Sequence, residues 1–515
     1  MERFFNTAGP CNPANHYMLP WEHRLPGVRD LMDQQLYFVV HAPRQVGKTT
    51  SFRHLARALT AEGKYAALLA SCETGQTARS DIKAGVMGIV RSIEANARQD
   101  LPDELRPPPA DLDQIEGESR LAVYLEQWTR ACPRPLVLFL DEIDALLDES
   151  LLSVLRQLRA GYFNRPEGFP HSMALIGLRD VRDYKMKVRP EQESAGTASP
   201  FNVKVRSIRL RDFNAEEVDE LYRQHTAETG QKWTDEAVAR AFELSQGQPW
   251  LVNALAYQIC STDLRDRTQV IGVEHIEQAK ETLIERRDTH LDSLVARLNE
   301  PRVRRVIEPI LTGDVSFDPT FNDDFSFVHD LGLVAQREGA MVIANPIYAE
   351  IIPRILSFHV QMGIYLQPQW FVAEDGTLDM MKLIGKFLEF WQENGEVLLK
   401  GMPYQEAAPH LVFMAYLQRV VNHGGRIARE FAVGTKRADL VVDFGGRKDV
   451  IELKLASASR ALQRGLEQVA AYSKRLGRDG GYLIIFDPAS DTPWEERGAV
   501  EAVVYEGVTV TVVRA

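Results

Sequence analysis

Short apolar runs alternate with amphipathic segments over the first part of the chain. Four runs are almost wholly apolar, as in strands buried on both faces, and they span 36–43, 65–71, 135–142 and 172–178. Residues 48–63 have helical spacing and end near Gly63, and 204–210 is expected to be the last strand of this region. Strands that alternate with helices predict an α/β fold built on a mostly parallel sheet.

The pattern changes after this first domain, which we place at 1–212. Residues 213–285 contain helical segments only, and 286–360 give helices, two short strands and a final helix, the pattern of a winged-helix module. Residues 361–378 read as a linker. Residues 379–515 give two helices, three strands, a helix, a strand and a hairpin, which predicts a second α/β domain. A chain of 515 residues is too long for one core, in agreement with several domains.

Composition is typical of globular protein, with 45% hydrophobic and 26% charged residues. No apolar run reaches the roughly 18 residues of a membrane span. The N-terminus lacks a secretory pattern and the four cysteines lie far apart, so we expect a cytoplasmic protein with no membrane contact. The net charge is −12, yet residues 401–480 carry 13 Lys and Arg against 8 Asp and Glu. This local basic bias leaves room for a nucleic-acid partner.

The segment APRQVGKT follows a predicted strand and opens a predicted helix, which is the context of a phosphate-binding loop. Such a loop turns backbone N–H groups toward phosphate oxygens, and Gly47 lets the backbone approach without a Cβ. Lys48 is expected to reach the β- and γ-phosphates of ATP, and the Thr49 hydroxyl is expected to ligate Mg²⁺. The residues expected to contact the nucleotide are Ala42, Pro43, Arg44, Gln45, Val46, Gly47, Lys48, Thr49 and Thr50.

An acidic pair ends the third apolar run. Asp141 and Glu142 fall where a parallel strand reaches the carboxyl edge of the sheet, beside the phosphate-binding loop. We expect Asp141 to hold Mg²⁺ and Glu142 to orient and polarise the attacking water. Asp144, two residues further on, reads as a helix cap or a surface residue. The loop and the pair together predict binding and hydrolysis of ATP.

Two carboxylates and a lysine fall within otherwise apolar strands of the last domain. Asp439 starts one strand, and Glu452 and Lys454 lie on the next, which a short turn joins to the first. Period-2 geometry puts Glu452 and Lys454 on one face with Leu453 in the core, and antiparallel pairing brings Asp439 to them. Charged groups in apolar strands are costly unless they serve a function. Carboxylates that hold Mg²⁺ or Mn²⁺, with a lysine that positions water, can hydrolyse a phosphodiester.

LFLDEID at 138–144, together with the phosphate-binding loop, resembles the AAA+ class, particularly the branch of archaeal-type and STAND ATPases. The resemblance covers about residues 1–360. It implies a helical lid at 213–285, and it is compatible with assembly into a homo-oligomer. It implies that Arg179, in IGLRD, senses the γ-phosphate and that Pro249, in GQPW, packs near the adenine.

Two parts of this resemblance are less complete. HYML at 16–19 is placed like the segment that covers the base in related ATPases. The lid has no clear arginine at its usual sensor position, which puts a standard second sensor in doubt. Three arginines are candidates to act on a neighbouring subunit, and each is more often a surface residue: Arg182, Arg206 and Arg209.

The last domain resembles the PD-(D/E)XK nuclease superfamily, with Asp439 as the D and Glu452-x-Lys454 as the E-x-K. Gln468 and Tyr472 match the Q-x3-Y signature of one of its branches. The proline of the superfamily name is absent, because Ala438 precedes Asp439.

Residues around this set complete the comparison. Glu406 is placed like the extra helical acid of that fold, and Glu430 is a rival for the role. Basic residues that flank the set could contact a phosphate backbone; they are Lys436, Arg437, Arg460, Arg464, Lys474 and Arg475.

These observations favour an ATPase switch or motor that controls a metal-dependent nuclease on the same chain, acting on nucleic acid and most simply on DNA. One alternative is a signalling or binding ATPase whose last domain keeps the nuclease fold without cutting. A third is an ATPase that acts on protein partners, which the acidic net charge of −12 keeps open.

Overall fold

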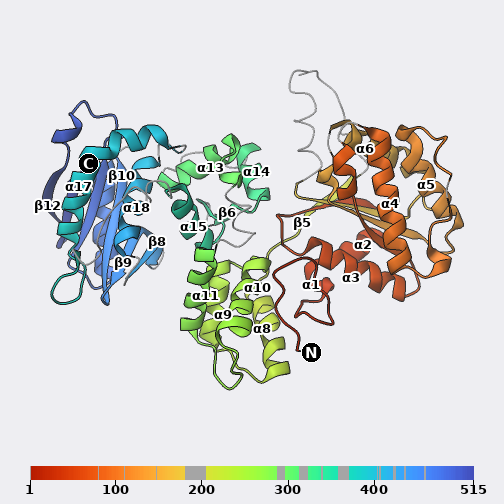
Figure 1. Cartoon of the computed structure of the whole chain (residues 1–515), viewed down its shortest axis with the longest axis horizontal. Coiled ribbons are helices and arrows are strands. Elements are labelled where there is room, and N and C mark those ends of the chain that lie inside the picture. The colour runs from red at the N-terminus through yellow and green to blue at the C-terminus, as the bar shows by residue number, and fades with distance from the viewer. Residues whose placement is uncertain are drawn as a thin grey trace. The chain divides into compact units, whose positions relative to one another are not determined.

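The chain falls into two units in a computed structural model, and each is described by itself (Figure 1). The first unit is Met1–Glu285 with Asp330–Gly332, and the second is Arg286–His329 with Leu333–Ala515. The structure describes residues 2–78, 81–109, 111–146, 148–179, 204–286, 296–312, 323–337, 340–357, 371–402, 404, 407–421, 425–433, 436–457 and 460–515.

A five-stranded parallel sheet lies at the centre of the first unit (Figure 1). Its strands are β1 (Tyr37–His41), β2 (Ala66–Ser71), β3 (Leu136–Asp141), β4 (Ser172–Gly177) and β5 (Lys204–Arg209). Their order is β2-β3-β4-β1-β5, and every neighbouring pair runs parallel. The predicted α/β fold with a parallel sheet is therefore confirmed.

Helices cover both faces of this sheet because residues along each buried strand alternate between two cores. Val39, Leu68 and Leu138 face one core, and Phe38, Leu69 and Phe139 face the other. The first core is closed by α4 (Ile82–Asp100), α5 (Gly117–Ala131) and α6 (Asp148–Gly161). The second is closed by α1 (Trp21–Arg24), α2 (Val28–Asp33) and α3 (Lys48–Ala61).

A group of helices follows β5 within the first unit. They are α8 (Ala215–Thr229), α9 (Asp235–Ser245), α10 (Pro249–Tyr257) with a π-helical extension to Asp263, and α11 (Val273–Arg286). A reciprocal cap starts α8, since the Asn214 side chain accepts from the Glu217 N–H and the Glu217 side chain accepts from the Asn214 N–H. Pro249 occupies the first turn of α10, where its missing N–H leaves no hydrogen bond unmade.

Among its described residues, the second unit begins with three helices and a hairpin. They are α13 (Pro301–Thr312), α14 (Asp323–Asp330), β6 (Val334–Arg337), β7 (Ala340–Ile343) and α15 (Pro346–Leu356). The two strands are antiparallel, and their pairing runs from Val334 with Ile343 to Arg337 with Ala340.

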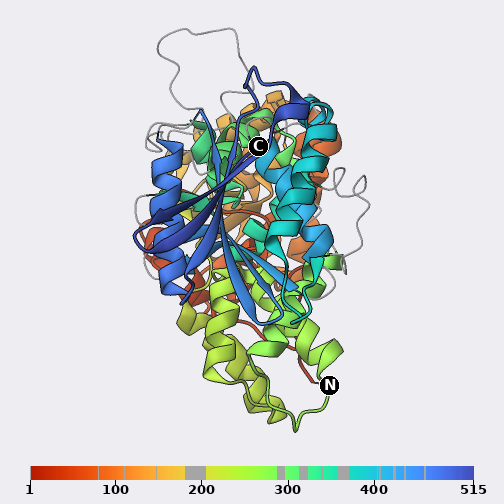
Figure 2. The same ribbon diagram turned by 90° about the vertical axis from the view of Figure 1, so that its left-hand side faces the viewer.

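A six-stranded mixed sheet makes up the rest of the second unit, in the order β12-β13-β11-β10-β9-β8. The strands are β8 (Gly425–Val433), β9 (Lys436–Phe444), β10 (Arg447–Leu455), β11 (Gly480–Phe486), β12 (Ala499–Tyr505) and β13 (Val508–Arg514). One face packs on α19 (Ala461–Arg475), and the other on α17 (Met380–Gly401) and α18 (Ala408–Val421). Figure 2 views this sheet between the blue α19 and the cyan α17 and α18.

Two sequence expectations differ from the structure. Residues 1–35 are polar and proline-rich with no clear period, a pattern that predicts no regular element, yet they form the short helices α1 and α2 and a bridge between Phe4 and His16. The composition of GTKR at 434–437 predicts a turn, but Lys436 and Arg437 belong to β9, because its pairing with β8 continues as far as Val433 and Lys436. Residues 188–202, whose composition predicts an exposed loop, and the first part of the linker lie outside the described residues.

Candidate functional site

The phosphate-binding loop lies between β1 and α3, with Gly47 immediately before the helix. Gly47 has φ 90°, a left-handed conformation that disfavours any side chain. Lys48 is buried, and its Nζ donates to the carbonyl oxygens of Ala42 and Pro43, each at 2.8 Å. Burial lowers the pKa of Lys48, while the nearby charges of Glu142 and Asp141 act to raise it. The lysine is thus held over its own loop, where it can exchange carbonyl oxygens for phosphate oxygens.

The acidic pair meets this loop at the end of β3. The Thr49 hydroxyl donates to Oδ2 of the buried Asp141 at 2.5 Å. Burial raises the pKa of Asp141, against the hydrogen bond from Thr49 and the charge of Lys48. A hydroxyl and a carboxylate in contact are hard oxygen ligands, so the donor set fits Mg²⁺.

Glu142 has an unusual backbone. Its φ of 53° and ψ of 42° are left-handed, which is uncommon for a residue with a long side chain. Burial and the neighbouring Asp141 charge both raise the pKa of Glu142. Asp144, expected to cap a helix or face solvent, instead accepts a hydrogen bond from the Leu178 N–H at 3.0 Å and so joins the segment after β3 to the end of β4.

A cavity of about 410 Å³ opens beside the loop. Its lining includes loop residues Arg44 to Ser51, Glu142, and three residues of α10, namely Pro249, Trp250 and Asn253. Residues from the N-terminal segment form another part of the wall, among them Tyr17, Met18 and Leu19 of the predicted base-covering stretch. The volume and the mixture of loop N–H groups with apolar side chains suit a nucleotide.

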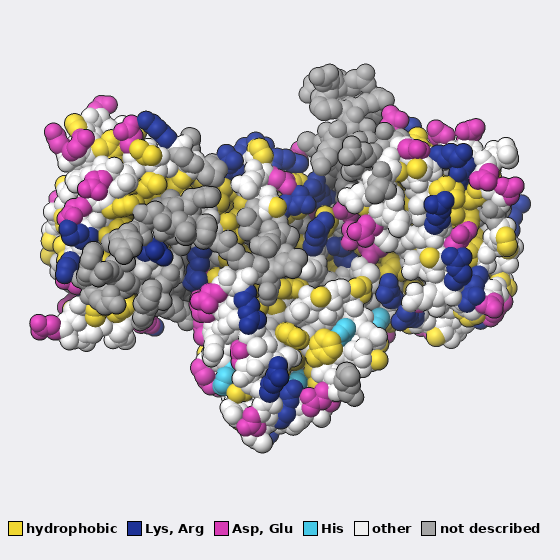
Figure 3. All heavy atoms as spheres, in the orientation of Figure 1, with side chains coloured by type: hydrophobic (Ala, Val, Ile, Leu, Met, Phe, Trp, Pro, Cys, Tyr) yellow, Lys and Arg dark blue, Asp and Glu magenta, His cyan; other side chains and the backbone are white. Residues whose placement is uncertain are grey.

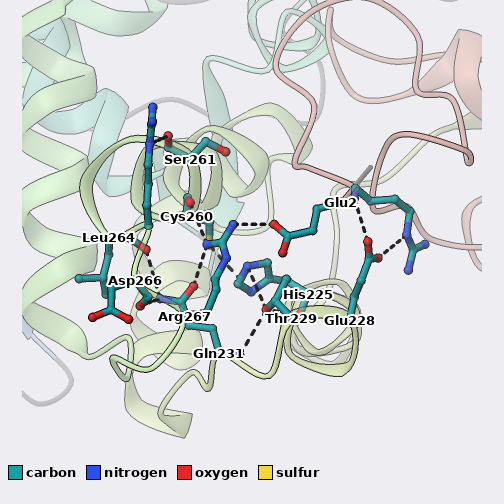
Figure 4. A network of polar contacts seen from close by, with 12 residues as sticks. Glu2, His225, Glu228, Thr229, Gln231, Cys260, Ser261, Leu264, Asp266 and Arg267 are labelled. Atoms are coloured by element: carbon teal, nitrogen blue, oxygen red, sulfur yellow. Dashed lines mark hydrogen bonds and ion pairs between the residues drawn. The ribbon is translucent and has the colours of Figure 1, made fainter.

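Residues 2–19, called here the N-terminal arm, are hydrogen-bonded to the helical group that follows β5. The Glu228 carboxylate accepts from Arg3 N and Nε, and the Glu2 carboxylate accepts from Arg267 at 3.1 Å (Figure 4). Gln224 pairs with the backbone of Met18 through both of its amide atoms.

The same arm also reaches α10 and α3. The Trp250 indole N–H donates to the Thr7 carbonyl at 2.9 Å, and the Cys11 N–H donates to the Thr50 hydroxyl at 3.0 Å. Sequence reasoning missed the arm as a wall of the site, apart from residues 16–19, because irregular segments carry no period.

Arg24 is another part of the site that the sequence did not predict. It is buried, lines the cavity and donates through Nη2 to the carbonyls of Val46 and Arg211. Its guanidinium lies 4.7 Å from the centre of the Phe213 ring. Burial lowers the pKa of Arg24 to about 10. One cation therefore joins α1, the phosphate-binding loop and the start of the helical group.

Other predicted residues of this site are placed as follows. Arg179 follows β4 and is buried, but it is not among the described residues that line the cavity. Asp141 is likewise not among the described residues that line the cavity, and its carboxylate accepts the hydrogen bond from the Thr49 hydroxyl. Arg206 and Arg209 lie on the exposed parts of β5, and Arg182 is outside the described residues.

The second unit brings Asp439, Glu452 and Lys454 together at adjacent positions of β9 and β10. Lys454 Nζ lies 2.7 Å from Glu452 Oε1 and 3.5 Å from Asp439 Oδ2. Asp439 Oδ2 also accepts from the Leu453 N–H at 3.0 Å. Antiparallel pairing of Ile451 with Leu440 sets this register, so the predicted meeting of the three side chains is what the strands produce.

Asp439, Glu452 and Lys454 are called here the carboxylate cluster. Burial and neighbouring charges shift the pKa values of Glu452 and Lys454. Glu452 is fully buried, and burial followed by the Asp439 charge raises the pKa of Glu452. Burial acts to lower the pKa of Lys454, but the charges of Asp439 and Glu452 outweigh it and raise the pKa. Asp439 is about one-third exposed, with 32% of its side chain open to solvent, so the cluster has an approach from outside. Two carboxylates with one exposed edge fit a divalent cation in place of the ammonium.

Tyr472 on α19 is buried and packs with Val441 and Val450 beneath the cluster. Burial, followed by the charge of Glu452, raises the pKa of its hydroxyl, while a hydrogen bond with Gln468 acts to lower it. The predicted pair Gln468 and Tyr472 is therefore in contact.

Several predicted side chains of the second unit lie outside the described part of the structure. Glu406 lies outside the described residues, and Glu430, Lys436 and Arg437 fall on strands where only the backbone is described. Within the described residues, no group of three or more His, Cys, Asp or Glu side chains could hold a metal ion.

The parallel sheet, the loop and the acidic pair define a P-loop ATPase. A family model described as an AAA-like domain matches residues 28–352, which is more than half of the chain. The chain therefore belongs to the AAA-like domain family. The match ends before the six-stranded sheet, so it does not bear on the carboxylate cluster.

Three solved structures illustrate distant likenesses. The Walker-type ATPase PABY2304 of Pyrococcus abyssi is 12% identical over 68% of this chain and 99% of that chain, with a TM-score of 0.49. ORC2 of Aeropyrum pernix is 14% identical over 66% and 96%, with a TM-score of 0.37. The RuvB Holliday junction branch migration motor of Thermotoga maritima is 13% identical over 63% and 91%, with a TM-score of 0.33. The family assignment rests on the family model and not on these likenesses.

Two further comparisons are negative. No curated protein matches the chain. Over the part of the chain that the structure describes, no helix is both long and apolar enough to cross a bilayer.

Proposed function

We propose that this P-loop ATPase is a switch or motor that controls a metal-dependent nuclease on the same chain, with DNA as the expected substrate. In this proposal the core is 1–212, the helical lid is 213–285 and the winged-helix module is 286–360. The linker is 361–378, and the nuclease-like domain is 379–515. The observation that carries the proposal is the contact of Asp439, Glu452 and Lys454 on paired strands.

In the ATPase half, each described residue has one task. Lys48, which now donates to the carbonyls of its loop, would bind the β- and γ-phosphates. Thr49 and Asp141 would hold Mg²⁺, which supplies neutralisation of phosphate charge when bound. Glu142 orients and polarises the attacking water, a task that its left-handed backbone and partial burial support by fixing its position. Pro249 packs against the base, and Arg179 senses the γ-phosphate through the end of β4.

In the nuclease half, Asp439 and Glu452 would hold Mg²⁺ or Mn²⁺, and a divalent metal bound there would supply a lowered water pKa and stabilisation of developing charge. Lys454, whose ammonium contacts both carboxylates, would position the attacking water. Gln468 and Tyr472 support Glu452 from α19, since Tyr472 packs directly under the sheet. Basic residues on α19 and the turn before it, such as Arg460, Arg464 and Lys474, contact the phosphate backbone.

Charge on the rest of the molecule bears on this proposal. On the face of the first unit seen in Figure 3, basic and acidic side chains are interspersed rather than gathered by sign. The net charge of −12 likewise argues against a general cationic coat. A nucleic acid would therefore be bound locally, and binding should weaken steeply with salt.

Cleavage of plasmid and single-stranded DNA in Mg²⁺ or Mn²⁺ tests the proposal directly. The Asp439→Asn variant should lose cleavage while it keeps ATP hydrolysis. Asp443→Asn is the matched control, because Asp443 lies on the same strand with a side chain 40% exposed and away from the cluster. Equal cleavage by the two variants would remove the site assignment.

A second candidate is a binding or signalling ATPase whose last domain does not cut. It is favoured by the position of the Lys454 ammonium, which already contacts both carboxylates. This candidate predicts nucleic-acid or partner binding that is unaffected by divalent metal, and no cleavage by the wild-type chain in either metal.

A further inference from the structure

Strand β12 forms one edge of the six-stranded sheet, and among the described residues no strand pairs with its outer side. Its pairing with β13 runs without a bulge from Ala499 with Arg514 to Tyr505 with Val508. The strand has no proline and one charged residue, Glu501, whose carboxylate accepts from Arg514 at 3.0 Å. Most edge strands are protected by charges, proline or bulges, and a regular apolar edge without them is a template for another strand.

An exposed apolar stripe lies along this edge. Val503 and Tyr505 pack against the core beneath α19, so the alternate residues Val500, Ala502 and Val504 point to the opposite face of the sheet. All three are exposed, and Val504 has 73% of its surface open to solvent. The edge therefore offers apolar side chains as well as backbone groups.

The backbone of β12 presents its hydrogen-bonding groups to the open side at these same residues. The Thr509 N–H donates to the carbonyl of Asp479, just before β11, at 2.9 Å, so it points away from β12. Thr509 is the partner of Val504, and two directly opposite residues of an antiparallel pair exchange either both hydrogen bonds or neither. The N–H and C=O of Val504 therefore point to the open edge, and those of Ala502 and Val500 do so by alternation.

We propose that β12 pairs with β12 of a second copy of this chain, antiparallel about a two-fold axis at Ala502. Val500 then lies opposite Val504 of the second copy, and Ala502 lies opposite itself. This is the one register in which all three outward-facing residues meet outward-facing residues, since any shift leaves at least one of them without a partner in β12.

The symmetry of the stripe is what favours a second copy over an unrelated strand. Valine meets valine and alanine meets alanine, so the same surface serves both subunits, as a two-fold interface requires. The charge of Glu501 is already paired with Arg514 in its own subunit. A contact between two short strands is small, so the dimer is expected to be weak and to depend on concentration.

Sedimentation of the full chain over a range of concentrations, without nucleotide or DNA, tests the proposal. The wild-type mass should rise from one copy to two. Ala502→Lys and Ala502→Glu each place two like charges directly opposite one another on the axis, so each should raise the dissociation constant of the dimer about five-fold. A mixture of the two variants places opposite charges there and should pair at least as tightly as wild type. Recovery on mixing also shows that both variants are folded.

Val397→Lys is the matched control. Val397 lies on α17 of the same unit and is 74% exposed, close to the value for Val504. The variant adds the same charge outside the β12 edge and should keep the wild-type dissociation constant.

Three results would overturn the inference. One is a wild-type chain that stays a single copy at every concentration, a result that needs no variant to fold. Another is a dimer that Ala502→Lys leaves as tight as in wild type, which would place the interface elsewhere. The third is a mixture of the lysine and glutamate variants that pairs no better than either variant alone, which would exclude the axis at Ala502.

Discussion

Acidification is expected to loosen the arm from the helices after β5 through one residue, His225. The ring is buried among Phe5, Tyr17 and Trp233, with ring centres 5.8, 5.8 and 6.2 Å away. Its Nδ1 accepts from the Trp233 indole N–H at 3.4 Å, so a second ring proton would meet a donor instead of an acceptor. Burial, followed by the charge of Arg267, lowers the pKa of His225 from 6.5 to about 4.

The sign and size of the effect follow from this shift. An unfolded chain takes up the proton near pH 6.5, while the folded chain keeps the ring neutral until about pH 4. The free energy of unfolding therefore falls as pH drops between these values, by at most about 3 kcal/mol in total and about 2 kcal/mol by pH 5. For a unit of this size, about 2 kcal/mol corresponds to a loss of roughly 4–8 °C in Tm.

Thermal unfolding between pH 7 and pH 5 measures the prediction in wild type, His225→Gln and His23→Gln. Glutamine stays uncharged and can still accept from Trp233, so His225→Gln should lose less Tm on acidification than wild type. His23 is 47% exposed, and its replacement should leave the wild-type slope unchanged. Equal slopes for wild type and His225→Gln would show that protonation of His225 does not cause the loss of stability in acid.

Two further predictions concern the nucleotide site. Glu142→Gln should retain ATP but hydrolyse it at least about a hundred-fold more slowly, since only the polarised water is lost; phosphate release and nucleotide binding measured together would decide this. Arg24→Met should weaken ATP binding by about ten-fold or more, because it removes a buried cation from the cavity wall, whereas Arg29→Met, which breaks only an exposed pair with Glu62, should not change it. Unchanged ATP affinity in Arg24→Met would show that this guanidinium is structural only.

Local patterns predicted the parts of the molecule that short-range geometry determines. The loop between β1 and α3 follows from a motif in its strand–helix context, and the meeting of Asp439 with Glu452 follows from period-2 alternation and a short turn. Both predictions needed only neighbours in the sequence or across one hairpin.

The missed parts depend on contacts between distant segments. Arg24 meets the Arg211 carbonyl through one hydrogen bond, and Arg3 meets Glu228 through two. Such polar contacts leave no trace in hydrophobic spacing. Asp144 was misread for the same reason, since its partner is the backbone N–H of Leu178 on another strand end.

We propose that nucleotide controls DNA cleavage, and the rate of cleavage by the full chain in Mg²⁺, with and without ATP, measures this control. Three proteins suffice: wild type, Lys454→Ala, and Lys448→Ala as the control on the same strand, whose side chain is 44% exposed. We expect wild type and Lys448→Ala to cleave DNA at a rate that ATP changes, and Lys454→Ala to cleave at least about a hundred-fold more slowly. Cleavage by Lys454→Ala at the wild-type rate would remove Lys454 from the nuclease site, and a wild-type rate that ATP leaves unchanged would exclude nucleotide control.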